Sequence, residues 1–230
     1  MKLTRRHTLT LATAHAALVA GSVGAMAAFA ADSIGKVETV ANDVWGTPSG
    51  AARAALEQAA AIFRNELLET GDDSAAGVRF IDESKLTLGA NAHAVIDEYV
   101  YAGDASRSVM TLTKGAFRFI SGQMPEKNMR LKTPTVTIGI RGTELKIDVY
   151  DDGATELSTI DGAASIVSNV TNQALEILAG HSVSVDKDGV MGVIRDFIHK
   201  SKDEAIERGM DELRRRSRIP FLPDIPNPFK

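Results

Sequence analysis

The stretch from residue 131 to residue 148 constrains the fold more than any other part of this 230-residue chain. It opens with β-branched side chains, which lose little rotamer freedom on a pleated surface and therefore favour a strand. These residues are Thr135, Val136, Thr137, Ile138 and Ile140. Gly139 and Gly142 interrupt the run, and a glycine inside a strand indicates a bulge, a bend or a close backbone approach. Pro134 cannot donate to a ladder, so we expect it at the start of the strand or on an edge.

Turn residues divide most of the remaining chain into short apolar runs. Asp151-Asp152-Gly153 is typical of a hairpin turn, and similar Gly, Asn, Asp and Ser clusters recur about every 8–12 residues. This spacing predicts an all-β sandwich, roll or solenoid-like domain of many short strands. Aromatic residues make up only 5% of the chain, so small aliphatic side chains must fill the core. The absence of cysteine excludes disulfides and thiolate chemistry.

The N-terminus has the three parts of a cleavable export signal over residues 1–30. Lys2, Arg5 and Arg6 precede a weakly apolar stretch that is too short and polar to span a membrane, and Ala28-Phe29-Ala30 offers a cleavage site. Adjacent arginines leave both the general secretory and the twin-arginine routes open. Cleavage removes three cations and no anion, which moves the formal net charge from −4 to −7. We therefore expect a periplasmic or secreted protein that does not bind nucleic acid.

The character of the sequence changes near the C-terminus. Apolar residues recur at helical spacing among charges of both signs, which predicts an amphipathic helix over residues 187–218. These apolar residues are Met191, Ile194, Phe197, Ile198, Ile206, Met210 and Leu213. Four prolines make residues 219–230 an extended tail. Residues 31–186 are then the β domain.

The central stretch resembles the signature of the FecR domain, a family named for the regulator of ferric-citrate transport. The resemblance lies in Thr133-Pro134 and in Thr137-Ile138-Gly139-Ile140-Arg141-Gly142-Thr143. Further blocks keep the family's order, among them residues 44–48, 80–91, 97–101 and 114–122. The resemblance covers about residues 34–185. It implies an all-β fold of the FecR type, here an antiparallel sandwich or roll followed by the C-terminal helix.

One function of the best-known family members is not expected of this chain. The best-known members cross the inner membrane, sense a loaded outer-membrane receptor and control a cytoplasmic sigma factor. This chain shows no N-terminal cytoplasmic helical domain and no transmembrane helix after one, so sigma-factor control is not expected of it. We expect a free-standing exported member. The six motif residues Thr133, Pro134, Gly139, Arg141, Gly142 and Thr143 are expected to be mainly structural.

Two interpretations conflict over residues 51–68. Apolar residues at 3.6-like spacing predict an amphipathic helix. The pair Asn65-Glu66 and Thr70-Gly71 resembles family residues that flank a strand. We expect a short helix over Ala51 to about Ala60 and an extended segment from Ile62 to Leu68.

No residue pattern points to catalysis. The three histidines beyond the signal lack metal spacing, no Gly-x-Ser-x-Gly elbow is present, and no phosphate loop surrounds Gly139 and Gly142. We therefore expect no catalytic residue, no metal and no cofactor. Arg141 has two interpretations: a guanidinium held for a carboxylate or phosphate, or a structural arginine paired with an acid such as Glu144.

Three functions remain open on the sequence alone. The leading one is a non-enzymatic module of the bacterial envelope that binds a protein or glycan in sensing or scaffolding. Its partner contacts would come from the segment after Met191, including Arg214, Arg215, Arg216 and Arg218. The alternatives are a carbohydrate-active protein that uses carboxylates on a β face, and a structural protein that oligomerises through the C-terminal helix.

Overall fold

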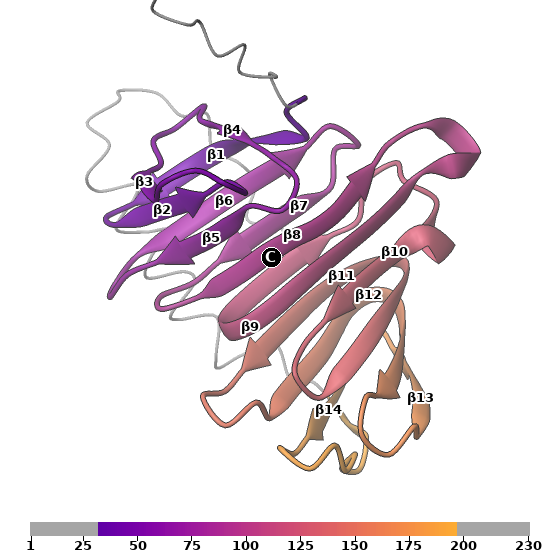
Figure 1. Ribbon diagram of the computed structural model, residues 1–230. Helices are drawn as coiled ribbons and strands as arrows, with labels where there is room; N and C mark the ends of the chain where they lie inside the picture. The colour runs from indigo at the N-terminus through magenta and orange to yellow at the C-terminus, as the bar shows by residue number, and fades with distance from the viewer. Residues whose placement is uncertain (1–31, 197–230) are drawn as a thin grey trace, which may run out of the picture. The chain divides into compact units, whose positions relative to one another are not determined.

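The computed structural model describes residues 32–196, and these form one large, mostly antiparallel sheet of fifteen strands (Figure 1). The first eight strands are β1 Gly35–Ala41, β2 Val44–Thr47, β3 Ala54–Ala55, β4 Ala61–Ile62, β5 Leu67–Thr70, β6 Ala75–Phe80, β7 Lys85–Leu88 and β8 His93–Val100. The other seven are β9 Arg107–Ile120, β10 Met129–Lys132, β11 Val136–Val149, β12 Thr155–Ser168, β13 Ala174–Leu178, β14 His181–Val185 and β15 Arg195–Asp196. Two 3₁₀ turns, Gly103–Ala105 and Glu126–Asn128, are the only helical residues in this range. The all-β prediction is confirmed.

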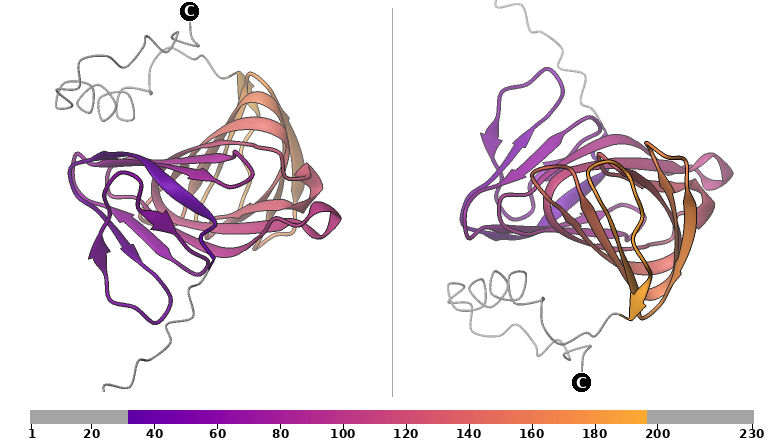
Figure 2. Two further views of the ribbon diagram at one scale, coloured as in Figure 1. Left: turned by 90° about the horizontal axis from the view of Figure 1, so that it is seen from above. Right: turned by 90° about the horizontal axis from the view of Figure 1, so that it is seen from below.

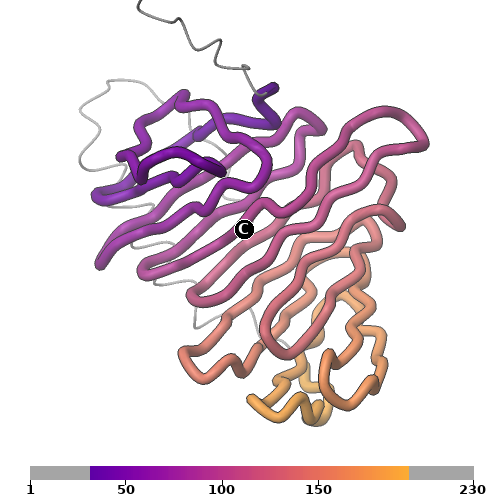
Figure 3. The backbone as a smooth tube through the Cα atoms, in the orientation of Figure 1, coloured from indigo at the N-terminus to yellow at the C-terminus, as the bar shows by residue number. Residues whose placement is uncertain are grey.

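Three long strands change partners halfway along, and this divides the sheet into two layers. The first half of β9 pairs with β8 and, in parallel, with β10, whereas its second half pairs with β7 and β11. In the same way β11 pairs with β10 and then β9, and β12 pairs with β14 and then β13. Figure 3 follows the backbone through these long strands, and Figure 2 shows the sheet coiling over itself.

We call the two parts layer 1 and layer 2. Layer 1 contains β3, β2, β5, β8, the first half of β9, β10, the first half of β11, the second half of β12, and β13. Layer 2 contains β4, β1, β6, β7, the other halves of the three long strands, β14 and β15. One cluster of buried side chains from both layers forms the core. As expected, it is rich in Val, Ile, Leu and Ala, with Phe80 and Tyr99 stacked at a centroid distance of 5.2 Å.

Glycines stand where each long strand passes from one layer to the other. Gly115, Gly142 and Gly162 all have positive φ, at 105°, 57° and 71°. A Cβ at Gly162 would overlap the carbonyl oxygen of Gly142, so the two bends of β11 and β12 are in direct contact. Only glycine combines this conformation with such close approach. The predicted bend at Gly142 is therefore present, and it is a corner between layers.

The prediction of a helix over Ala51–Ala60 is wrong. This segment contains β3, and its backbone bonds to the neighbouring strands: Leu56 N–H donates to Val44 O and Ala59 N–H to Val37 O, both at 2.9 Å. A helix of ten residues pays the full nucleation cost, and alanines bury little surface to offset it. Hydrogen bonds to β1 and β2 therefore stabilise these backbone groups more than an isolated short helix would. The extended segment predicted after it is present in part, as β4 and β5.

The C-terminal prediction can be compared with the structure over residues 187–196 only. This part forms no helix, since Met191 bridges to Val185 and Arg195–Asp196 forms β15 against β14. Met191 is buried in the core cluster, so its side chain helps to close one end of the core. Residues 197–230, with Arg214, Arg215, Arg216 and Arg218, lie outside the described residues, as does the predicted signal over residues 1–30.

Candidate functional site

A buried threonine cluster anchors the start of the central stretch. The Thr155 hydroxyl lies 2.8 Å from that of Thr133 and 2.9 Å from that of Thr135. Thr133 Oγ1 also accepts the Val136 N–H, and the Asn169 side chain donates to Thr133 O at 3.0 Å. Pro134 stands in the turn just before β11, as predicted. These contacts tie the β10–β11 turn to β12, so Thr133 and Pro134 belong to the framework.

The corner uses the end of the same motif. The Thr143 hydroxyl donates to Asp161 O, and Thr143 N–H donates to the Ser121 hydroxyl at 3.0 Å. Thr143 is buried, next to the Gly142–Gly162 contact. Gly142 and Thr143 thus fix the corner between β11 and β12.

Arg141 lies beside this corner on the outer surface of layer 1. Its Nη1 donates to Glu176 Oε1 of β13 at 2.7 Å, and the two side chains are 66% and 51% exposed. The acid suggested from the sequence, Glu144, instead accepts Arg118 Nε at 2.7 Å in layer 2. An exposed pair of this kind contributes little stability, and its guanidinium stays open to solvent.

The outer surface of layer 1 brings further cations beside Arg141. Met129 and Leu131 of β10 point into the core, so alternation turns Arg130 and Lys132 outward. In the register of β10 with β11, Arg130 lies opposite Gly139 and Lys132 opposite Thr137. Along the strands, Lys132, Arg130 and Arg141 therefore follow one another at intervals of about 7 Å.

Small residues of β11 and β12 lie beside these cations. Gly139 lies opposite Ser165 of β12, and a Cβ on Gly139 would come within 2.6 Å of the Ser165 hydroxyl. Arg130 Nη1 lies 3.7 Å from that same Cβ position, so its guanidinium extends over Gly139. Arg130 Nη1 also donates to Lys127 O and Met129 O, both at 2.8 Å, which fixes its direction. We call Arg130, Lys132, Thr137, Gly139, Arg141 and Ser165 the cationic surface.

Two of these cations have no acidic partner within residues 32–196. The ion pairs found there include Arg141 with Glu176 but neither Arg130 nor Lys132. Both side chains are exposed. Sequence reasoning missed them, although the alternation of Met129, Arg130, Leu131 and Lys132 carried the signal. It could not show that a glycine and a serine lie beside them.

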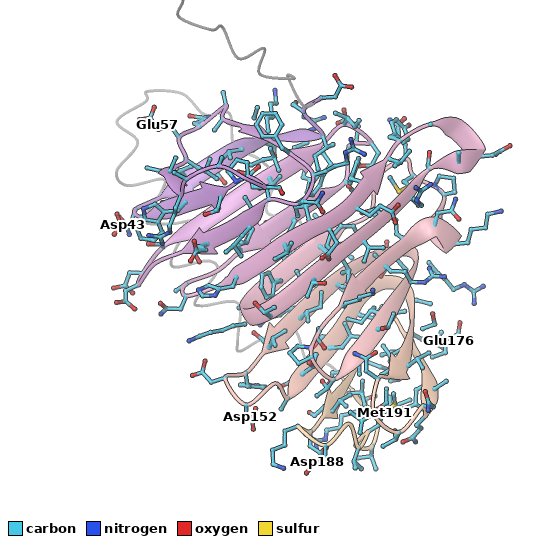
Figure 4. All side chains as sticks on the ribbon, viewed as in Figure 1. Asp43, Glu57, Asp152, Glu176, Asp188 and Met191 are labelled. Atoms are coloured by element: carbon cyan, nitrogen blue, oxygen red, sulfur yellow. The ribbon has the colours of Figure 1, made fainter. Side chains whose placement is uncertain are left out.

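A cleft of about 350 Å³ lies in the first part of the sheet, lined by residues that include Asp43, Trp45, Leu56 and Glu57. Figure 4 shows Asp43 and Glu57 far from Glu176 and Met191. The Arg53 guanidinium lies 3.9 Å from the centroid of the Trp45 ring and donates to Glu69 at 2.8 Å. The exposed indole face is therefore already occupied by a side chain of the chain itself.

Asp82 is the most buried carboxylate among residues 32–196, with no exposed surface. It accepts hydrogen bonds from the Tyr99 hydroxyl, from Ser84 and, at 3.3 Å, from Met124 N–H. Burial, together with the Asp82 carboxylate, raises the pKa of Tyr99. Asp82 therefore holds the β6–β7 turn against β8 and the loop after β9.

Within residues 32–196, no group of three or more His, Asp or Glu side chains is placed to bind a metal ion. The same part of the chain contains no helix with the length and hydropathy to span a membrane.

The arrangement of layers, corner and motif defines an all-β module with an exposed cationic surface. Residues 66–165 match the family model described as FecR protein, and the chain therefore carries a FecR domain over this range. No curated protein matches the chain. Two crystal structures of "a putative anti-sigma factor" from Parabacteroides distasonis match at 13% identity with a TM-score of 0.47. Each match covers 56% of this chain and 59% of the other protein, so the chain spans less than two thirds of that protein's length.

Proposed function

We propose that this protein is an exported module of the bacterial envelope, built on a FecR-type roll, that binds an acidic segment of another envelope protein in sensing or scaffolding. The FecR domain supports a regulatory or sensing role. The export signal predicted for residues 1–30 supports the location. The cationic surface supports the mode of binding, and no catalytic step is part of the proposal.

One observation carries the proposal: exposed Arg130 and Lys132, without acidic partners in the described part of the chain, lie side by side on β10 and next to the small residues Gly139 and Ser165. A chain of formal charge −7 after cleavage repels acidic partners in general. A local group of cations then selects where an acidic segment can dock and speeds its approach. In an extended peptide, alternate residues lie about 7 Å apart, which matches the spacing of the three cations.

Site-specific photocrosslinking in cells tests the proposal. A photoreactive residue replaces Ser165 on the cationic surface, and a matched variant carries it at Ser184, which lies on a strand of layer 2. We expect a specific protein, identified by mass spectrometry, to crosslink from position 165 and not from position 184. Equal capture from both positions, or capture of a glycan instead, would contradict the proposal.

Charge reversal then tests the chemistry. Lys132→Glu should weaken binding of the captured partner by about tenfold, because it replaces an attraction by a repulsion across a partly desolvated contact. Lys36→Glu is the control, since Lys36 is an exposed strand lysine of layer 2. Binding of the unaltered protein should also weaken as salt rises. An affinity that is the same for both variants and insensitive to salt would exclude the cationic surface.

A further inference from the structure

Four strands of the described chain pair with another strand on one side only, and they form the ends of the sheet. They are β3, β4, β13 and β15. Three of them contain two residues each, and such short strands protect an edge because they offer few unpaired backbone groups. The fourth, β13, contains five residues and lies at the border of the fold (Figure 1). It is therefore the longest open edge among these four strands.

The hydrogen bonds around β13 show which of its backbone groups are unpaired. Just before the strand, Ser168 N–H donates to Gln173 O at 2.9 Å, and just after it, Ala179 N–H donates to Gly162 O at 3.0 Å. Bonded and non-bonded residue pairs alternate in an antiparallel ladder, so every second residue of β13 bonds to β12. The residues between them direct N–H and C=O away from β12, and among residues 32–196 no strand pairs with these groups. The outward-directed residues are Ala174, Glu176 and Leu178.

The side chains of these three residues favour a further strand at this edge. Ala174 and Leu178 are exposed on the outer surface of layer 1, and Leu178 is 56% exposed. The strand contains no proline and no lysine, two residues that discourage pairing at an edge. Its one charged residue, Glu176, accepts Arg141 Nη1 at 2.7 Å. Neither the backbone nor an unpaired charge therefore opposes strand addition.

We propose that β13 pairs with β13 of a second copy of this chain, antiparallel and about a two-fold axis. Such an axis pairs the edge with itself, so assembly stops at a dimer. The full overlap is centred on Glu176 and places the small Ala174 of each copy opposite the large Leu178 of the other. The two Glu176 carboxylates meet at the axis, where the ion pair with Arg141 reduces their repulsion. An acidic segment of another protein is disfavoured here, because it would add carboxylates beside Glu176.

The dimer has one continuous outer surface. Antiparallel pairing of two identical edges requires a two-fold axis perpendicular to the sheet, so both cationic surfaces lie on the same side of it. Five strand spacings separate β11 of one copy from β11 of the other, which is about 24 Å along the sheet. The pairing itself uses the backbone of β13 and no residue of the cationic surface, so this inference stands or fails independently of the proposed function.

A proline substitution in the full mature chain tests the pairing. Glu176→Pro removes the outward N–H and places a ring where the second strand would lie, whereas an edge strand tolerates a proline whose nitrogen faces solvent. Glu176→Thr is the matched control, because it loses the same ion pair with Arg141 and keeps the N–H. Sedimentation equilibrium over a range of concentrations measures the dimer dissociation constant. We expect Glu176→Pro to raise it by about tenfold or more over Glu176→Thr, since each dimer loses two hydrogen bonds.

Single cysteines give a second measurement that does not require the proline variant to fold, because the chain has no cysteine of its own. Glu176→Cys places two thiols at the axis with their Cα atoms about 5.5 Å apart, within reach of a disulfide. Ser165→Cys is the control, since Ser165 is exposed opposite Glu176 on β12. In the dimer its two copies lie three strand spacings apart, about 14 Å, which is too far. We expect disulfide-linked dimers from position 176 and not from position 165.

Three results would overturn the proposal. The first is a monomer at every concentration. The second is a dimer that is as tight in Glu176→Pro as in Glu176→Thr, because another surface would then hold it together. The third is equal disulfide linkage from positions 165 and 176. In contrast, failure to capture a partner from position 165 while the dimer stays intact would contradict the proposed function alone.

Discussion

The outer surfaces of the two layers are built on the same alternating strands, and the charges on β10 of layer 1 differ from those on several strands of layer 2. In layer 2, Glu38 receives both Arg79 at 3.4 Å and Lys85 at 3.2 Å, and Arg118 pairs with Glu144 across β9 and β11. In layer 1, Arg130 and Lys132 stand exposed with no acid beside them in the described chain. Cross-strand ion pairs occur in both layers, since Arg107 pairs with Glu98 and Arg141 with Glu176 in layer 1. The difference is local: Arg130 and Lys132 place two cations without acidic partners among the described residues on one short strand, β10.

Both layers depend on the corner, and its glycines give the largest expected effect. Gly162→Ala forces a Cβ into the Gly142 carbonyl oxygen at positive φ, so we expect a loss of about 3 kcal/mol or more in the free energy of unfolding. Gly180→Ala is the matched control, because Gly180 has φ 80° but no atom within 4 Å of its Cβ position. It should cost about 1 kcal/mol. Urea denaturation measures both, and equal losses would refute the corner as the critical contact.

Removing one arginine from each layer addresses the comparison itself. Arg118→Ala in layer 2 breaks a pair whose side chains are only 26% and 20% exposed, and it should cost about 1–2 kcal/mol of stability. Arg130→Ala in layer 1 should change stability by less than about 0.5 kcal/mol. The midpoints of urea unfolding at fixed slope give both values. If Arg130→Ala proves as costly as Arg118→Ala, the cations of layer 1 are structural after all.

A third test concerns Glu66, a buried acid directly before β5 that pairs with no cation among the described residues. Burial raises the pKa of Glu66 above its ordinary value of 4.5, against the opposing effect of the Phe63 N–H donated at 2.8 Å. The folded state then binds this proton more tightly than the unfolded chain does. Its contribution to stability is complete below pH 4.5 and is lost as the pH rises through the folded-state pKa.

Glu66→Gln should therefore flatten the fall in stability above pH 4.5, because glutamine keeps an oxygen for Phe63 N–H and carries no charge to bury. Unfolding at a series of pH values measures this slope. A slope that is unchanged in the variant would show that other groups cause it. Glu69→Gln is the control, since Glu69 bonds to Arg53 near the surface.

The smallest effect is expected at the motif arginine. Arg141→Ala removes an exposed pair with Glu176 and should cost at most about 0.5 kcal/mol. It should nevertheless weaken binding of the partner captured at Ser165. A large loss of stability with unchanged binding would assign Arg141 to the framework of the fold and remove it from the cationic surface.

The sequence predicted the strands and the bend of the central stretch, because β-branched residues and glycines act over a few residues. It failed at Ala51–Ala60, where the helical pattern is real but the backbone bonds to β1 and β2 instead. The residues of the candidate site were likewise predicted only in part. Arg141 stood out in the sequence, whereas Arg130, Lys132 and Ser165 join it only through the pairing of β10, β11 and β12.

What the sequence by itself determined is the all-β class, the turn positions and the glycine bend at Gly142, since each follows from local sterics and alternation. The tertiary structure alone decided that the long strands cross between layers, that Glu176 and not Glu144 pairs with Arg141, and that cations gather over Gly139. The physical reason is the separation along the sequence over which each effect acts. Backbone preference and side-chain alternation are fixed within a few residues, but which strands pair, and in which register, depends on burying one common core.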